Sequence, residues 1–461
     1  MRLLEVIDSI LLTLYLLWPH PRPIAIRLFP SAALMIALIH LLVEKYRWQM
    51  IPIYILTGLL TLASLEKMAV PTDWSSPASY MMAFLLALSI ALPILLPVPI
   101  IPTSSGKYKV GSTSYEMIDV TRKEIYSGKD EPRRFMVQIW YPADVKSTDK
   151  SSPWITKADV YMSAISTFIE LPGFFLDHLK LVKTPAYEDA AIVNADETFP
   201  VILFSHGWNG FYAQNTGQAI ELASRGYVVI SIQHTYGAVT TVFPDDTIAP
   251  NNPEALPTNP EDPDYEIVAR KLVNQWAGDM SFVLDQFQRL NSEGDSIFFQ
   301  KLNLERIGVY GHSTGAGAAI QFCATDSRCK AVLGMDPFMR PVSAEVIRSG
   351  VSKPSFFMFS ELWAEDQESR NNILFHEFRA NAIDNKGVIE ISNTKHFDFS
   401  DVPLLSPIAS HLGLKGSLKG KRVIKIVNSY LLDFFEMTLN NKPSVLFGRA
   451  FSDFLEVKVL Q

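Results

Sequence analysis

The first hundred or so residues carry four apolar runs, separated by short polar or proline-containing segments. The runs cover residues 3–18, 28–43, 50–65 and 79–102. A bilayer core needs about 20 apolar residues, with about 17 as a lower limit, so only the last run is long enough to span with ease. Because the runs are clustered, and helices of a soluble domain normally keep a polar face, we predict an all-α transmembrane bundle of about four spans over residues 1–103.

Two other interpretations of these runs are a signal peptide and the core of a soluble domain. A cleavable signal peptide has a basic start and a single apolar region, whereas Glu5 and Asp8 stand near this N-terminus and further runs follow. The alternative that some runs are core helices of a soluble domain stays open. Aromatic residues near the ends of the runs favour a membrane, because Trp and Tyr are enriched at membrane interfaces. These residues are Trp18, Tyr46, Trp48 and Trp74.

From residue 104 onward the pattern changes to short β-rich segments that alternate with amphipathic helical stretches. Most of the later strands are continuous apolar runs, which is typical of strands buried on both faces of a parallel sheet. The pattern predicts an α/β domain over residues 104–461, with a mostly parallel eight-stranded sheet and helices on both faces. Insertions near 146–197 and 244–264 interrupt the alternation and are candidate rims or lids. The expected strands are residues 115–121, 135–141, 201–205, 227–233, 306–311, 331–336, 355–360 and 388–392.

Composition narrows the possible classes of function. The chain has 461 residues, is 48% hydrophobic and carries a formal net charge of -7, so it lacks the basic field that nucleic acid requires. We find neither zinc-type Cys/His spacing nor a glycine-rich phosphate loop, and we expect no metal and no cofactor. The only two cysteines, Cys323 and Cys329, could pair in an oxidising compartment or remain buried thiols.

The segment GHSTG, residues 311–315, follows an apolar strand and precedes a helical pattern. This is the G-x-S-x-G nucleophile elbow of α/β-hydrolases in its strand-turn-helix context, with Ser313 as the nucleophile. The glycines let strand and helix approach closely, and the helix N-terminus favours developing negative charge. The alternative is an ordinary tight turn. His312 should point away from the nucleophile and form a structural hydrogen bond.

A serine hydroxyl needs a base, and the base needs an orienting carboxylate. His396 lies in a loop just after the last expected strand, where this fold presents its base. Two carboxylates compete for the third role, because Asp336 and Glu361 end successive strands. Geometry leaves both open, while Asp398 is too near His396 in sequence to be a comfortable partner and is expected to fix its loop.

The tetrahedral oxyanion needs two backbone N–H donors. One is expected from Thr314, directly after the nucleophile. The other should lie on the loop after an earlier core strand, and the segment VILFSHGWNGF places Trp208 there. Trp208 as a plain core aromatic is the alternative.

Five segments resemble the platelet-activating factor acetylhydrolase family of the plasma and type II class. They are FSHGWNGF at 204–211, LASRGYVVISIQH at 222–234, GHSTGAG at 311–317, GMDPFMRPV at 334–342 and TKHFDFSDVPLL at 394–405. The resemblance implies an α/β-hydrolase fold, a triad of Ser313, Asp336 and His396, and an oxyanion hole of the Trp208 and Thr314 amides. It also implies calcium-independent hydrolysis of short or oxidised sn-2 acyl chains of phospholipids. Ala316 departs from the family pattern, and so does the N-terminal bundle.

We therefore expect a serine esterase that cleaves short acyl esters of lipids through an acyl-enzyme on Ser313, of the 1-alkyl-2-acetylglycerophosphocholine esterase type. A general short-chain carboxylesterase, or a dienelactone-hydrolase-like enzyme, is the alternative. A different class would be a membrane sensor or transporter with a silent hydrolase-like domain. The expected partner is a lipid or small ester, without nucleic acid, and the oligomeric state stays open. The apolar stretch 165–182 could flank an acyl pocket, dip into a membrane interface or simply pack on the domain.

The expected location is multi-pass in a bacterial-type cytoplasmic membrane. An even number of spans places both flanks of the bundle on one side. The positive-inside rule then favours, by a small margin, a cytoplasmic catalytic domain, because five basic residues lie on the domain's side of the bundle and three on the other side. The five are Arg2, Lys45, Arg47, Lys107 and Lys109, and the three are Arg22, Arg27 and Lys67.

Overall fold

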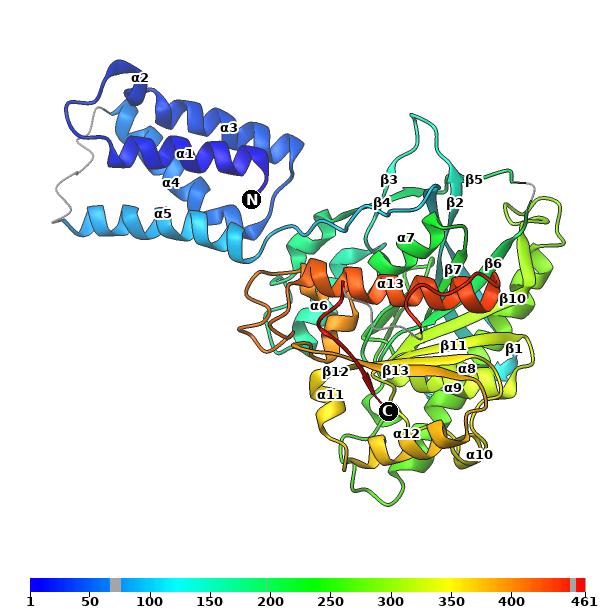
Figure 1. Cartoon of the computed structure of the whole chain (residues 1–461). Helices are drawn as coiled ribbons and strands as arrows, with labels where there is room; N and C mark the ends of the chain where they lie inside the picture. The colour runs from blue at the N-terminus through cyan, green and yellow to red at the C-terminus, as the bar shows by residue number, and fades with distance from the viewer. Residues whose placement is uncertain (67–75, 196, 448–452, 461) are drawn as a thin grey trace.

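The structure, a computed structural model, describes residues 1–66, 76–195, 197–447 and 453–460. Lys67 and Trp74, which entered the sequence argument, lie outside the described residues. The chain forms an elongated set of N-terminal helices and a larger α/β domain that holds both the sheet and the C-terminus (Figure 1).

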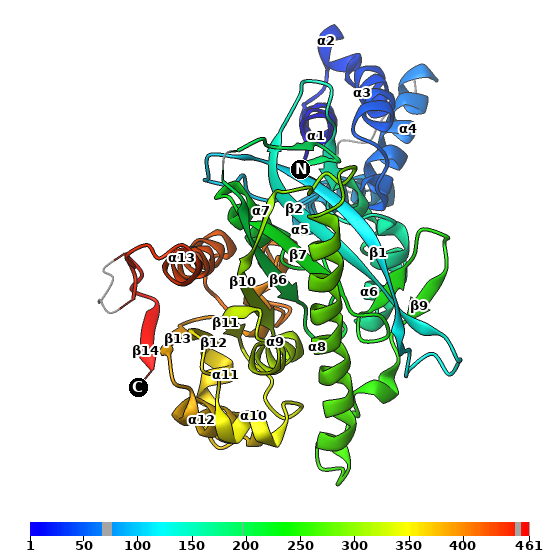
Figure 2. The ribbon, with the colours of Figure 1, turned by 90° about the vertical axis from the view of Figure 1, so that its right-hand side faces the viewer.

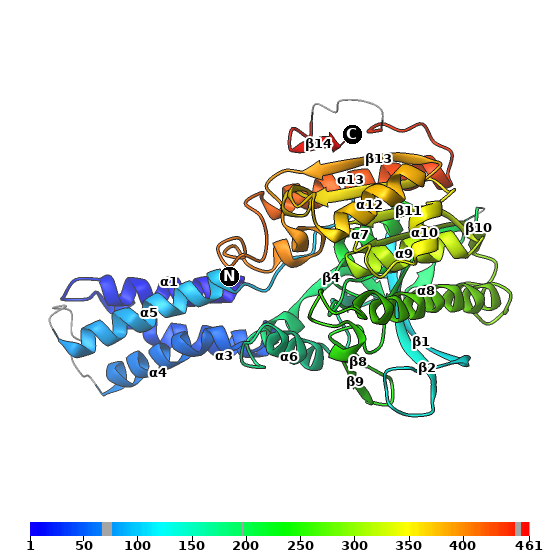
Figure 3. The same ribbon diagram turned by 90° about the horizontal axis from the view of Figure 1, so that it is seen from below.

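The N-terminal helices run alternately toward and away from the α/β domain (Figure 3). Their contact surface is apolar and includes Leu12, Ile53 and Leu56, each fully buried. At the end nearest the domain, the buried Arg47 binds both carboxylate oxygens of Glu5 at 2.8 and 2.6 Å. The helices are α1 (Leu3–Leu17), α2 (Ile24–Arg27), α3 (Phe29–Val43), α4 (Ile51–Leu65) and α5 (Pro77–Leu95).

Length and composition of the described helices allow two of them to cross a membrane. These are the helical stretch Trp48–Leu65, which includes α4, and α5 itself. Helices α1 and α3 have 15 residues each, which is below the lower limit of about 17. The structure shows that the region is helical. The number of about four membrane spans stays a prediction.

Twelve strands of the described chain form one mixed, mostly parallel sheet in the order β14-β13-β12-β11-β10-β6-β7-β2-β1-β4-β3, with β5 paired to β2. Each of the eight expected strands is present. The predicted number was too small, because four further strands of two to six residues come from the 146–197 insertion and from the C-terminus. The eight are β1 (Lys109–Lys123), β2 (Pro132–Asp144), β6 (Phe199–Ser205), β7 (Val228–Gln233), β10 (Leu302–His312), β11 (Cys329–Met335), β12 (Ser355–Ser360) and β13 (Asn385–Ile391). The four are β3 (Ser151–Pro153), β4 (Lys183–Glu188), β5 (Ala191–Ile192) and β14 (Val457–Leu460).

The five neighbouring pairs from β7 to β13 are all parallel, so their carboxyl ends meet at one edge of the sheet. Strands β6, β7 and β12 are buried along their whole length, in keeping with their apolar sequences. Side chains that follow these strands therefore converge at that edge, where ligands of open α/β sheets bind.

Helices cover both faces of the sheet (Figure 2). One apolar core joins the sheet to α8 (Tyr265–Leu290), α9 (Thr314–Thr325), α10 (Ala344–Ser349) and α12 (Arg370–Asn381). The other core joins it to α6 (Ala158–Phe168), α7 (Thr216–Ser224) and α13 (Gly420–Leu439). The remaining elements are α11 (Glu361–Glu365), the small sheet of β8 (Thr240–Val242) and β9 (Ile248–Pro250), and short 3-10 turns at 48–50, 177–181, 253–255, 396–399 and 402–404.

Helix α6 of the 146–197 insertion lies between the N-terminal helices and the sheet (Figure 3), while the strands β3, β4 and β5 of the insertion belong to the sheet. The Trp48 indole N–H donates to the Phe175 carbonyl at 3.0 Å, and its ring contacts both Phe174 and Phe175. On its other side the insertion contacts the loop after β6, since Tyr161 packs on Phe211. The insertion thus connects the helical region to a loop that borders the candidate site.

Candidate active site

Ser313 occupies a sharp turn between β10 and α9. Its φ and ψ angles are 56° and -124°, outside the ordinary regions for a residue with a side chain. Gly315 has no room for a Cβ atom, which would lie 2.2 Å from the carbonyl oxygens of Ser205 and His206. The turn therefore requires the glycine of the G-x-S-x-G segment, and strain of this kind is characteristic of functional residues.

The structure brings Asp336 and His396 together. The His396 Nδ1 lies 3.0 Å from Asp336 Oδ2, with Asp336 fully buried and the His396 side chain 23% exposed. Ser360 holds the same carboxylate in place, because its backbone N–H donates to Oδ1 and its hydroxyl donates to Oδ2, both at 2.7 Å. Glu361 turns elsewhere and accepts a hydrogen bond from the Asn393 backbone N–H at 3.0 Å.

Two aromatic rings pack against the His396 side chain. The indole of Trp363 stacks on it with a centroid distance of 4.5 Å and an interplanar angle of 12°. The His312 ring lies 4.4 Å away, and its Nε2 lies 2.9 Å from the His396 carbonyl oxygen. Burial lowers the pKa of His312 well below its ordinary value. His312 is therefore neutral and donates its Nε2 proton to that carbonyl.

The loop that carries His396 is closed by Asp398. This carboxylate accepts hydrogen bonds from the backbone N–H groups of Lys395 and Gly416, at 2.8 and 2.6 Å. Among the described residues the Ser313 hydroxyl has no hydrogen-bond partner, so it is not hydrogen-bonded to His396 in this structure. Nucleophile-to-base hydrogen bonds in unliganded hydrolases often tighten only when substrate binds.

The loop after β6 lies directly against the nucleophile. A Cβ atom on Gly207 would lie 3.1 Å from the Ser313 Cβ. In the part of the chain that the structure describes, the backbone N–H groups of Trp208 and Thr314 have no acceptor. Thr314 opens α9, where the helix dipole adds favourable potential for an anion. Two free amides from separate elements beside one serine can serve as an oxyanion hole.

Sequence reasoning missed three residues that shape this site. Ser360 was assigned only to a strand, although a polar residue that ends an apolar strand beside the expected acid is a usable signal. Trp363 was given no role, and no local pattern indicates that it stacks on His396. His206 was not distinguished from the neighbouring glycines, although its side chain contacts the Gly207 carbonyl.

One described cluster has metal-ligand atoms within 4.8 Å of one another, and it lies among the N-terminal helices rather than in the site. Its members are Glu5, His40 and Glu44. Arg2 and Arg47 already bind Glu5 at 2.6 to 2.8 Å, so the positive charge that a metal would supply is provided by the two guanidinium groups. The cluster fits a structural ion-pair network.

The fold and this arrangement define a serine hydrolase of the α/β-hydrolase class. A model of the platelet-activating factor acetylhydrolase, isoform II, family matches residues 97–445, about three quarters of the chain. The chain belongs to this family and is a serine esterase acting on carboxylic esters, which confirms the resemblance found in the sequence.

Relatives agree with the family assignment. The chain is 26% identical over 361 residues to a platelet-activating factor acetylhydrolase of Cavia porcellus, covering 74% of this chain and 78% of the relative. It is 24% identical to a probable 1-alkyl-2-acetylglycerophosphocholine esterase of Arthroderma benhamiae, covering 78% and 94%. A solved ferulic acid esterase from Streptomyces cinnamoneus superposes with a TM-score of 0.64 at 23% identity, covering 79% of this chain and 99% of that one, and shares the fold.

Proposed function

We propose that this chain hydrolyses short acyl esters of lipids at a membrane surface, with Ser313, His396 and Asp336 as its catalytic triad. His396 Nε2 takes the proton of the Ser313 hydroxyl while the serine oxygen attacks the ester carbonyl. The Trp208 and Thr314 amides bind the resulting oxyanion. The tetrahedral intermediate collapses to an acyl-enzyme as His396 protonates the departing alkoxide. Water, deprotonated by His396, then releases the acid and restores the serine.

The observation that carries this proposal is the hydrogen bond of 3.0 Å between His396 Nδ1 and Asp336 Oδ2. It fixes the proton of a neutral His396 on Nδ1, so that Nε2 is left as the free base that the serine requires. The alternative acid, Glu361, accepts instead from a backbone N–H of the neighbouring loop, which supports Asp336 in the role.

A lipid ester is favoured as substrate by both the relatives and the surroundings of the site. The relatives' names refer to an acetylated ether phospholipid. The insertion next to the oxyanion loop exposes large apolar side chains, with Phe168 53% and Phe174 58% exposed. Its contact with Trp48 joins this surface to the helical region. A substrate with an apolar body could approach the site along it.

Membrane integration of the N-terminal helices is part of the same proposal. Soluble helical domains direct polar residues outward, but here large apolar side chains cover the outward faces of all four long helices. Examples with more than half of their surface exposed are Leu17 of α1, Met35 of α3, Leu62 of α4 and Phe84 of α5. A hydrocarbon environment removes the cost of exposing them.

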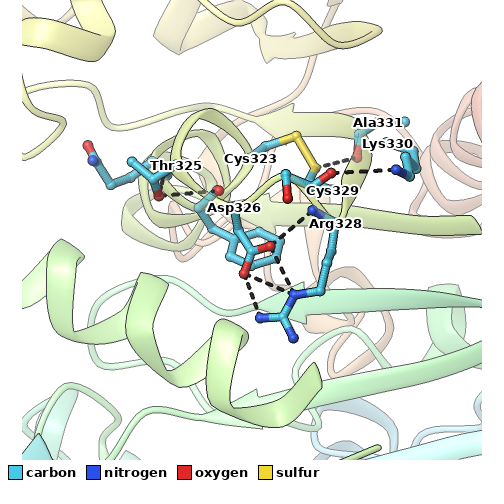
Figure 4. Close-up of a disulfide and its surroundings, with 10 residues drawn as sticks. Cys323, Thr325, Asp326, Arg328, Cys329, Lys330 and Ala331 are labelled. Carbon is cyan, nitrogen blue, oxygen red and sulfur yellow. Dashed lines mark hydrogen bonds and ion pairs between the residues drawn. A yellow bond between two sulfur atoms is a disulfide. The ribbon is translucent and has the colours of Figure 1, made fainter. Parts of the chain in front are cut away.

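We further propose that the catalytic domain faces an oxidising compartment. Cys323 and Cys329 form a disulfide, with Cα atoms 5.1 Å apart and both residues fully buried (Figure 4). Disulfides persist in extracellular and periplasmic spaces and are rare in the cytosol. This argument opposes the small excess of basic residues on the domain side of the bundle. We give it more weight because the disulfide is a feature of the folded catalytic domain, whereas the excess of basic residues is only five against three.

A chain-length series tests the function. The full chain, purified in detergent and mixed with 1-alkyl-2-acyl-glycerophosphocholines, should release acetate or butyrate much faster than palmitate. Ser313→Ala is the matched control and should abolish release at every chain length. Faster release of palmitate would refute the short-chain specificity, and turnover by the Ser313→Ala variant would refute the nucleophile.

A further inference from the structure

A second serine, histidine and aspartate lie in hydrogen-bonded series beside the site, and all three are fully buried. The Ser205 hydroxyl is 2.9 Å from His234 Nε2, and His234 Nδ1 is 2.9 Å from Asp279 Oδ2. Their burial leaves no path for a substrate, so this is no second active site. These three residues can therefore affect the reaction only by holding neighbouring groups of the active site in position.

Arg133 balances the negative charge of Asp279, and the hydrogen bonds of the set then determine which ring nitrogen of His234 carries the proton. Burial acts to raise the pKa of Asp279, but the charge of Arg133, which binds both carboxylate oxygens at 3.0 and 2.6 Å, lowers it below its ordinary value. Burial lowers the pKa of His234, so its ring is neutral. A neutral His234 facing a carboxylate carries its proton on Nδ1, and its Nε2 therefore accepts from Ser205.

The backbone N–H of His234, rather than its side chain, determines the tautomer of His206. The His234 backbone N–H donates to His206 Nε2 at 3.1 Å, so this nitrogen is an acceptor. Burial, with a contribution from His234, lowers the pKa of His206 to about 3, and the ring is neutral at working pH. The one ring proton is therefore on Nδ1, which lies 2.7 Å from the Gly207 carbonyl oxygen and donates to it.

The Gly207 carbonyl belongs to the same planar peptide unit as the Trp208 N–H. In a trans peptide these two groups point in opposite directions. The carbonyl accepts both the His206 Nδ1 proton and the Gly210 N–H, the latter at 2.9 Å, and so it cannot rotate. The Trp208 N–H is thereby held on the opposite side, and none of the described residues accepts a hydrogen bond from it. Asn209, with a φ of 55°, completes the turn.

Aromatic packing keeps the two rings from moving. His234 stacks on Trp276 of α8 with a centroid distance of 4.3 Å and an interplanar angle of 4°. His206 meets the same indole at 5.2 Å. Gly237 passes so close to Trp276 that a Cβ atom there would lie 2.4 Å from it. The orientation of the peptide is therefore built into the fold before any substrate binds.

We propose that His206 is a positioning residue for catalysis: its Nδ1 proton orients the Gly207–Trp208 peptide so that the Trp208 N–H faces the oxyanion. The His234 backbone N–H keeps this proton on Nδ1 by donating to Nε2, and the Ser205–His234–Asp279 series holds the residue that carries that N–H. This inference rests on the proposed function, in which Trp208 supplies that donor. His206 does not touch the substrate and acts only on the transition state. Its loss should lower kcat and leave KM nearly unchanged, because the oxyanion forms only after the serine attacks.

A matched pair of amide variants separates positioning from folding. In His206→Asn the side-chain N–H lies at the level of Nδ1 and can still donate to the Gly207 carbonyl. In His206→Gln the side chain reaches the level of Nε2, where it can accept from His234 but no longer donates to Gly207. Removal of one oxyanion donor costs about 100-fold to 1000-fold in kcat. We expect about 100-fold loss for the Gln variant and less than about 10-fold for the Asn variant.

The readouts are kcat and KM for an acetyl ester with the full chain, and the inhibition constant of a trifluoromethyl ketone, whose serine adduct carries the oxyanion. In the Gln variant the inhibition constant should rise by about the factor by which kcat falls. In the Asn variant it should stay near the wild-type value. Equal losses in both variants, or losses that follow thermal stability or KM, would overturn the inference. An inactive wild-type chain would instead overturn the proposed function.

Ser205→Ala covers the case in which neither His206 variant folds. It removes only the hydroxyl that donates to His234 and leaves the rings in place. We expect a several-fold loss of kcat at constant KM, because His234 then has one fixed partner fewer. Wild-type kcat in this variant would contradict the proposed role of the buried series.

Discussion

Replacement of Asp336 by asparagine should abolish most turnover while the fold is kept. The neighbours of Asp336 determine which way the new amide turns. The Ser360 backbone N–H donates to Oδ1 at 2.7 Å, so an oxygen must stay there and the NH2 group must take the place of Oδ2. That NH2 group then faces His396 Nδ1 and donates to it. The His396 proton is forced onto Nε2, where the ring can no longer act as a base.

The expected loss is about ten-thousand-fold in kcat, the size found for the same exchange in a serine protease. At about 1.36 kcal/mol per factor of ten this corresponds to roughly 5.5 kcal/mol of transition-state stabilisation. The stability should change little, because the Ser360 hydroxyl can rotate and accept from the second N–H of the asparagine.

The assay compares Asp336→Asn with Glu361→Gln, using ester turnover and thermal unfolding of the full chain. Glu361 is about one-third exposed and accepts from a backbone N–H, which a glutamine oxygen can also do, so its exchange should cost less than about threefold. A larger loss for Glu361→Gln than for Asp336→Asn, at equal stability, would refute this assignment of the acid.

Four further outcomes are expected. Because the pKa of His206 falls from 6.5 to about 3 on folding, His206 contributes stability above pH 6.5 that is lost as the pH falls toward 3. This contribution is at most about 5 kcal/mol, and His206→Asn should show a flatter stability profile over that window in urea unfolding, whereas an unchanged profile would contradict the neutral ring. The Cys323–Cys329 loop spans a sequence separation of 6, so replacement of both cysteines by alanine should lower the free energy of unfolding by about 2 kcal/mol without loss of activity. Mass spectrometry of the native protein under non-reducing conditions should find this pair oxidised, and free thiols would contradict an oxidising location. The acyl-chain series described above should favour acetyl over palmitoyl esters, and a reversed order would contradict the short-chain specificity.

Much of the catalytic fold could be predicted because its central strands are buried on both faces. Such strands require continuous apolar runs, and β6, β10 and β12 were recognisable for that reason. The strands that escaped prediction are short and partly exposed. β5 has two residues and β3 has three, and strands of that length leave no periodic pattern to detect.

The residues of the candidate site could all be proposed from the sequence. The strand-turn-helix context indicates Ser313, and the loop after the last long strand indicates His396. Strand positions alone leave Asp336 and Glu361 open, because the ends of adjacent parallel strands meet at one edge and either could reach the histidine; the family resemblance favours Asp336. In the structure Asp336, with a φ of 43°, contacts both Ser360 and His396, which supports it as the acid. A local backbone angle of this kind has no signature in the apolar pattern.

The buried hydrogen-bond series was beyond sequence analysis for a related reason. Ser205, His234 and Asp279 come from three separate elements, and His234 and Asp279 are 45 residues apart in the chain. In the sequence, each of these three residues is an ordinary polar residue near the end of a strand or on a helix. Only the packing of α8 against the sheet brings Asp279 and Trp276 beside the loop after β6.

The central claim is that Ser313 is the nucleophile of a working acyl-transfer site. Its most direct test is labelling of the purified full chain with a fluorophosphonate probe, followed by mass spectrometry of the modified peptide and a parallel assay of acetyl-ester turnover. Our account predicts that one equivalent of probe attaches to Ser313, that turnover falls in proportion to labelling, and that Ser313→Ala neither labels nor turns over. Labelling at another residue, or full turnover after Ser313 is modified, would contradict it.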